Sequence, residues 1–336
     1  MNRELAEKVA DAVLYEGYML YPYRPSAMKN RQRWTFGTIY PPSYGEVGRG
    51  TEPAAMHVEC LFSTSTPEQV SFGITLRFLH LLTRKFWDKE SGEVASLKVD
   101  DQVLESWDEP TPRSVEFRAD GLPNRVQHQF HFPGHHEAEP VRDACSHILG
   151  SMSRTQYEIS GLLSLFIQEL GDGLFKLNID LSNETSQGDD TEDRTQSLLR
   201  SMLSAHLILA AEGGEFVSLL DPPTEFLAAA ESCKNVGNFP VLVGDSSERD
   251  MLLCSPILLY DYPQIAPESA GDFYDATEID EMLTLRVMTL TDEEKQEMRL
   301  ADDRVRSLLE RTEATAREQL IKTHGTFRNL RRVSGQ

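Results

Sequence analysis

The chain has 336 residues, and its 54 acidic side chains outnumber 33 lysines and arginines, which gives a net charge of −21. With 40% hydrophobic residues it can bury a core, which excludes an intrinsically disordered chain. The ends carry +2 (residues 1–49) and +4 (322–336), so residues 50–321 carry −27, a charge that repels phosphate backbones and excludes nucleic acid as a partner.

The first predicted elements are a helix and an arm, together residues 1–48. Apolar residues recur at helical spacing over residues 4–15, which predicts a short amphipathic helix. Tyrosines, arginines and a tryptophan then crowd residues 15–44, where four prolines oppose a helix. Such residues contribute much of the binding energy of interfaces, although they can equally plug the end of a fold. The predicted partner-binding residues are Tyr18, Tyr21, Tyr23, Arg24, Arg31, Arg33 and Trp34.

A domain of antiparallel strands is predicted for residues 49–186. From residue 56 the hydrophobic period becomes two, most clearly over residues 70–80 and 175–181, which is typical of half-buried strands. Gly171-Asp172-Gly173 predicts a hairpin turn. Seven or eight strands without long intervening helices favour a β-sandwich or barrel over residues 34–184.

An acidic linker, residues 187–194, is predicted to separate this domain from a mixed α+β domain at 195–336. The fold class expected for the whole chain is therefore α+β, a β-sandwich-like N-terminal half followed by a mixed half that ends in helices. The elements expected in the second half are a helix near 198–203, a hairpin at Gly213-Gly214 with a return strand at 216–220, a helix at 224–233, strands at 240–243 and 251–260, and capping boxes at Thr291/Glu294 and Thr315/Glu318.

The chain is expected to be cytoplasmic. No apolar run approaches the ~18 residues of a membrane span, and charges throughout the first 20 residues argue against a secretory signal. The cysteines at 60, 145, 233 and 254 are scattered, which predicts reduced thiols.

Histidines and carboxylates concentrate in residues 128–147, and such side chains are ligands for Zn²⁺ or Ni²⁺. The candidate metal ligands are His131, His135 and His136, although their spacing matches no known metal motif; the alternative is one packed histidine and a solvated loop. His57 and Glu59 are expected on one face of a strand, and Cys60 on the other. Phosphate-binding glycine motifs and a nucleophile elbow are absent, so no catalytic or cofactor-binding residue is predicted.

Seven acidic side chains lie within residues 261–281, around two prolines. Their spacing differs from that of an EF-hand calcium loop. We interpret the segment as an acidic surface loop, which is a suitable contact for a basic partner.

Seven segments of the sequence are similar to sequence motifs of one protein family. They are residues 13–24, 29–37, 214–223, 240–244, 255–261, 275–281 and 290–295. Through them the sequence resembles a little-characterised bacterial family encoded beside oxygen-tolerant, high-affinity uptake nickel–iron (NiFe) hydrogenases. The resemblance covers nearly the whole chain. It implies an accessory, maturation or assembly role, with hydrogenase subunits or maturation proteins as partners.

The first hypothesis is thus a non-enzymatic accessory or scaffold protein of a NiFe hydrogenase that acts by protein–protein contacts. The alternative is a metal-binding protein or metal-dependent hydrolase that uses the histidines and carboxylates of residues 128–147, with a divalent metal such as Zn or Ni. A third possibility is a structural subunit of a larger assembly, including a homo-oligomer.

Overall fold

The computed structural model describes residues 2–20, 22–27, 30, 36–42, 44, 53–186, 193–264 and 280–314. The chain divides into two compact units. The first comprises residues 1–18 and 34–265, and the second comprises residues 19–33 and 266–336.

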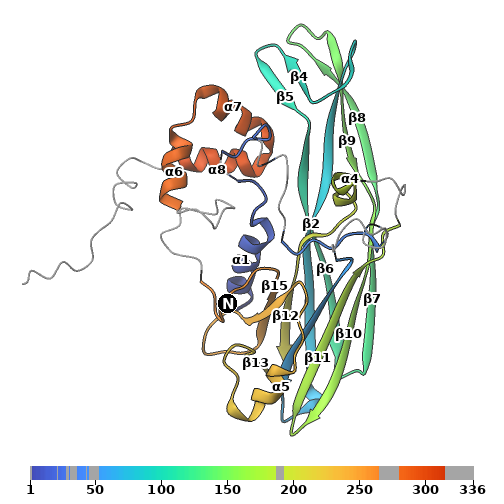
Figure 1. Cartoon of the computed structure of the whole chain (residues 1–336), viewed down its shortest axis with the longest axis vertical. Helices are drawn as coiled ribbons and strands as arrows, with labels where there is room; N and C mark the ends of the chain where they lie inside the picture. The colour runs from blue at the N-terminus through green and yellow to red at the C-terminus, as the bar shows by residue number, and fades with distance from the viewer. Residues whose placement is uncertain are drawn as a thin grey trace, which may run out of the picture. The chain divides into compact units, whose positions relative to one another are not determined.

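Two antiparallel sheets form the first unit (Figure 1). The five-stranded sheet contains, in spatial order, β13 (Glu215–Val217), β1 (Ala55–Ser63), β11 (Leu174–Asn183), β10 (Ile159–Gly171) and β7 (Arg125–Phe132). The eight-stranded sheet contains β14 (Phe239–Leu242), β15 (Met251–Ser255), β12 (Leu203–Glu212), β2 (Ser71–Asp88), β9 (Ile148–Gln156) and β8 (His135–Arg142), with β3 (Gly92–Val94) and β6 (Trp107–Asp120) also paired to β2. The strands β4 (Ser96–Val99) and β5 (Gln102–Glu105) form a separate hairpin.

The hydrophobic core lies between the two sheets, because alternate residues of each strand face inward. Val58 and Cys60 of β1 and Ile74 of β2 are buried in this core. The rings of Phe62 and Phe72 meet edge to face, with centroids 4.9 Å apart. The α+β class and the predicted β-sandwich are confirmed, as is the hairpin turn at residues 171–173, which joins β10 to β11.

The strand β2 is much longer than the sandwich requires. Its first part pairs with β12, whereas Thr83–Asp88 pairs with β9. On its other edge β2 pairs with β6 over fourteen positions, from Ser71 to Arg84. The distal part of β2, with β3, β4, β5, β8, β9 and the start of β6, therefore forms a β extension that continues past the sandwich (Figure 1).

The predicted N-terminal helix is α1 (Asn2–Tyr15), which covers the outer face of β12 and β15. Ala6, Ala10 and Val13 of this helix are buried together with Ile208 and Leu253. The two sheets therefore enclose one apolar layer, and α1 encloses a second layer on the eight-stranded sheet. The described residues of this unit also include four short helical elements: η1 (Pro67–Gln69), α4 (Arg194–Leu198), η2 (Thr224–Phe226) and α5 (Leu227–Glu231).

The second unit contains the helices α6 (Asp280–Met288), α7 (Asp292–Ala301) and α8 (Asp303–Ala314). The predicted capping box at the start of α7 is confirmed, since Thr291 and Glu294 exchange both hydrogen bonds. Residues 22–27, which are described, belong to the same unit. Arg24 Nη2, within this segment, lies 3.2 Å from the Glu294 carboxylate.

Three features differ from the sequence predictions. The helix α4 (Arg194–Leu198) ends before residue 203, because Leu203 begins β12. Strand β13, after Gly213-Gly214, pairs with β1 of the other sheet, so this turn crosses between sheets instead of closing a hairpin. Strand β12 pairs with β2, so the sandwich continues across the predicted 187–194 boundary. Most of that linker and the Thr315/Glu318 capping box lie outside the described residues.

Candidate functional site

The three candidate metal ligands lie on two strands that belong to different sheets. His131, on β7, places Nδ1 2.9 Å from the Ser160 hydroxyl. His135 and His136 begin β8 in the other sheet, and His136 places Nδ1 2.8 Å from the Thr155 hydroxyl. His135 and His136 directly follow Pro133-Gly134 and are part of a strand, whereas the sequence suggested an exposed loop. Within the described residues, no set of three ligand atoms includes any of these histidines.

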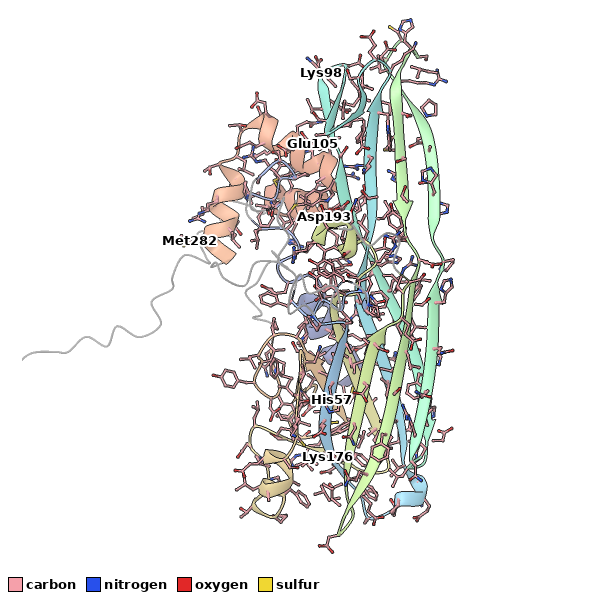
Figure 2. The ribbon with its side chains drawn as sticks, turned by 45° about the vertical axis from the view of Figure 1, so that its right-hand side comes forward. His57, Lys98, Glu105, Lys176, Asp193 and Met282 are labelled. Carbon is pink, nitrogen blue, oxygen red and sulfur yellow. The ribbon has the colours of Figure 1, made fainter. Side chains whose placement is uncertain are left out.

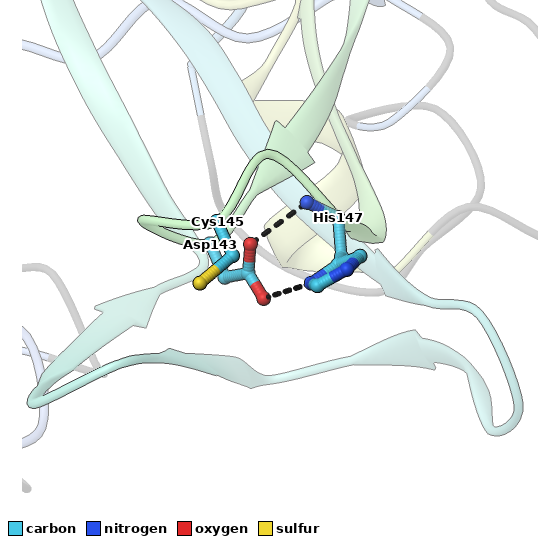
Figure 3. Close-up of side chains that lie close together, drawn as sticks. All are labelled: Asp143, Cys145 and His147. Atoms are coloured by element: carbon cyan, nitrogen blue, oxygen red, sulfur yellow. Dashed lines mark hydrogen bonds and ion pairs between the residues drawn. The ribbon is translucent and has the colours of Figure 1, made fainter.

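A different part of the same histidine-rich segment does gather ligand atoms. The turn between β8 and β9 brings together Asp143, Cys145 and His147, whose ligand atoms all lie within 4.8 Å of one another (Figure 3). Asp143 Oδ2 lies 2.9 Å from His147 Nδ1, and Asp143 Oδ1 accepts a hydrogen bond of 2.7 Å from the His147 backbone N–H. The hydrogen bond from the His147 side chain lowers the pKa of the Asp143 carboxyl.

The predicted pair of His57 and Glu59 is part of a polar network on the outer face of the five-stranded sheet. Two members of this network, His57 and Lys176, are labelled in Figure 2. His57 Nδ1 lies 2.7 Å from Asp180 Oδ1, and Glu59 Oε2 lies 3.2 Å from Lys176 Nζ. Burial opposes ionisation of Glu59, but hydrogen bonds from the Lys234 backbone N–H and from Lys176 outweigh it and lower the pKa of Glu59.

This network fastens a neighbouring segment to the sheet. Lys176 Nζ also donates to the Ser232 hydroxyl at 2.9 Å. The side chain of Asn235 bonds both the N–H and the C=O of Glu59. The arrangement is that of a structural clamp, in which Lys176 and Glu59 satisfy each other and hold residues 232–235 on β1 and β11.

Cys60 is buried on the opposite face of β1 from this network, as predicted, and burial raises the pKa of its thiol. Cys254 is also buried, whereas Cys145 is exposed. Cys233 is partly buried, and this burial raises its pKa to about 11. All four cysteines are free thiols, and Cys145 is the exposed one.

The aromatic-basic arm is described for three of the seven predicted partner-binding residues. Tyr18 is buried and accepts a hydrogen bond from the indole N–H of Trp107 at 3.3 Å. Tyr23 is fully buried, and Arg24 pairs with acidic residues of α7. These three side chains thus have an internal packing role, which was the alternative interpretation of the arm. The other four predicted residues, Tyr21, Arg31, Arg33 and Trp34, lie outside the described residues.

An exposed apolar surface occurs where the sequence predicted a continuing strand. The strand β15 ends at Ser255, and the segment that follows presents Leu258 and Tyr260, which are 79% and 86% exposed. Leu220, on a second loop, is 57% exposed. We refer to Leu220, Leu258 and Tyr260 as the apolar patch. The sequence prediction missed this patch because it treated residues 251–260 as one continuous strand. Pro256 is a sequence signal that the strand stops there.

The two loops that present the apolar patch meet at Asp261. The Asp261 carboxylate accepts hydrogen bonds from the Ser218 hydroxyl and from the Leu242 backbone N–H, the latter at 2.8 Å. The Ser218 hydroxyl in turn accepts a hydrogen bond of 3.1 Å from the N–H of Leu220. Asp261 is the first residue of the predicted acidic loop 261–281, of which residues 265–279 lie outside the described part of the chain. The patch is therefore held on a fixed junction of the first unit.

Comparison with protein-family models and with curated proteins found no match for this chain. Among the residues that the structure describes, we find no helix that could span a membrane.

Proposed function

We propose that this chain is a non-enzymatic accessory protein of a NiFe hydrogenase, which docks on a hydrogenase subunit or maturation protein through the apolar patch. The observation that supports this proposal is the strong exposure of Tyr260, Leu258 and Leu220 on a hydrogen-bonded junction. Single exposed apolar residues are common, but several large ones on two loops joined by a hydrogen bond form the kind of surface that marks an interaction site. Tyrosine is also enriched among the residues that dominate binding energy.

The junction favours binding because it reduces the entropy lost on docking. Asp261 joins the loop that bears Leu220 to the segment that bears Leu258 and Tyr260, and the Tyr262 N–H bonds the Leu242 carbonyl at 2.7 Å. Hydrogen bonds thus fix both patch-bearing segments to the first unit in the absence of a partner. A preorganised surface loses less conformational freedom on association, so more of the burial energy appears as affinity.

The link to a hydrogenase comes from the sequence resemblance. Residues 214–223 and 255–261 are two of the segments that resemble the hydrogenase-associated family, and they contain all three residues of the apolar patch. An accessory role therefore predicts that the partner's surface complements this patch. The acidic body around it also favours a partner with basic residues at the rim of the contact.

Co-purification from the native host tests the proposal. Full burial of one large apolar side chain contributes about 1.5–3 kcal/mol, so we expect Leu258→Ser/Tyr260→Ser to reduce recovery of hydrogenase subunits at least 10-fold. The matched control is Val103→Ser, which alters a 45%-exposed apolar residue of β5 on the β extension. Two results would contradict the proposal. One is equal recovery of hydrogenase subunits with the wild type, the double variant and the Val103→Ser control; the other is a wild-type sample that contains no hydrogenase subunit.

A further inference from the structure

We propose that the turn between β8 and β9 binds one divalent cation of the late first-row metals, such as Zn²⁺. The ligands are the Cys145 thiolate, the His147 imidazole and the Asp143 carboxylate. The proposal concerns the tip of the β extension. It does not depend on hydrogenase docking, so either proposal can fail without the other.

The three ligand atoms are already close to the arrangement that a metal ion needs. In a tetrahedral zinc site with bonds of about 2.0 to 2.3 Å, neighbouring ligand atoms lie about 3.3–3.6 Å apart. Asp143 Oδ2 and His147 Nδ1 are separated by 2.9 Å, and the whole set lies within 4.8 Å. Cys145 is exposed and the His147 side chain is 75% exposed, so small side-chain rotations can complete the site.

The backbone of the turn is fixed before any ion binds. The Asp143 N–H donates to the His147 carbonyl at 3.0 Å, and the Ser146 N–H donates to the Asp143 carbonyl at 2.9 Å. The Ala144 N–H donates to the Asp100 carboxylate at 3.0 Å, which ties the turn to the turn between β4 and β5. Alternate residues 143, 145 and 147 are thereby held together, and little ordering entropy remains to be lost on binding.

The proton balance of binding is simple. Without the ion, His147 Nδ1 and Asp143 Oδ2 share a hydrogen bond. When the cation binds Nδ1, the imidazole changes tautomer: Nδ1 gives up its proton and Nε2 takes one up, so the ring releases no net proton. The Cys145 thiol loses its proton to solvent when its sulfur bonds the ion. One proton is therefore released per ion bound, and affinity rises with pH.

The ligand types determine which ion fits. Thiolate and imidazole ligands favour Zn²⁺, Co²⁺ or Ni²⁺, whereas Mg²⁺ and Ca²⁺ require oxygen ligands. Three protein ligands leave the fourth position of a tetrahedral ion open for water or another ligand. An open site on an exposed turn suits an exchangeable ion.

Cobalt titration tests this site. The untagged full chain, stripped of metal with a chelator, is titrated with Co²⁺ and the thiolate-to-cobalt charge-transfer absorption is followed. We expect one equivalent to bind, with full displacement of the absorption by Zn²⁺. Cys145→Ser should abolish the thiolate absorption, and His147→Ala should weaken Co²⁺ binding at least 10-fold.

The control is the double variant His135→Ala/His136→Ala, which removes the neighbouring exposed histidines of β8 and should leave the titration unchanged. Circular dichroism checks that each variant is folded. Three results would overturn the proposal: no thiolate absorption in the wild type, absorption that survives Cys145→Ser but is lost in Cys233→Ser, or loss of binding only in the β8 double variant.

Discussion

The imidazole of His206 should make the stability of the first unit depend on pH. His206, on β12, is fully buried, and its Nδ1–H donates to the Ser204 carbonyl at 2.8 Å. Its Nε2 has no hydrogen-bond partner among the described residues. The charged groups that act on it are Arg77 of β2 and Asp11 of α1, which pair with each other. Burial lowers the pKa of His206 from 6.5 to about 4.

The sign of the effect follows from which state binds the proton. The unfolded chain protonates His206 as the pH falls through 6.5, whereas the folded chain does so only near pH 4. The contribution to the free energy of unfolding is therefore present above pH 6.5 and is lost between pH 6.5 and 4. At about 1.4 kcal/mol per pKa unit, the loss is about 3 kcal/mol.

The test compares His206→Gln, which cannot gain this charge, with the wild type in urea unfolding from pH 7 to pH 4. Trp87 of β2 and Trp107 of β6 lie in the first unit, so tryptophan fluorescence reports on its unfolding. We expect the wild type to lose about 3 kcal/mol more than the variant over this range. Ile208→Val is the control: it should cost about 1 kcal/mol at every pH, because it removes one buried methyl group. Parallel pH profiles for the wild type and His206→Gln would show that burial does not suppress protonation of His206.

Three further changes test the packing. Gly150→Ala should destabilise the first unit by about 2 kcal/mol or more in urea unfolding, since a Cβ atom there would lie 2.0 Å from the Trp87 carbonyl oxygen; Gly73→Ala, with 3.9 Å to its nearest neighbour, is the tolerated control. Thr291→Ala should lower the free energy of unfolding of the second unit by about 1 kcal/mol, because the capping box is lost; unfolding is followed by the helical circular dichroism signal. An unchanged free energy of unfolding would contradict a stabilising role of the capping box. Lys176→Met should destabilise the first unit by about 2 kcal/mol, because it leaves the half-buried Glu59 without its cation; a neutral effect would show that the clamp is dispensable.

Much of the sandwich could be predicted because it depends on local alternation. The strands β1, β2 and β11 each place every second side chain in the core, and the sequence shows that period directly. The partner of a strand is less predictable. Gly213-Gly214 has the composition of a hairpin turn, yet β13 pairs with β1, and that choice depends on tertiary packing of Phe216 against Phe62.

The candidate sites were predictable only in part. The sequence identified the histidine-rich segment 128–147, but only the register of β8 with β9 shows that residues 143–147 form a turn. Exposure of the apolar patch depends on where β15 ends, and burial of Tyr18 depends on Trp107, which is 89 residues away. Long-range contacts of this kind have no local sequence signal.

Photo-crosslinking from position 260 can identify the protein that contacts the apolar patch. A photoreactive phenylalanine analogue replaces Tyr260, the most exposed residue of the apolar patch, in cells of the native host. The same analogue at position 103 of the β extension is the control. We expect a crosslink from position 260, but not from position 103, to a hydrogenase subunit or maturation protein. Crosslinks to neither class of protein, or equal crosslinks from both positions, would contradict the proposed docking.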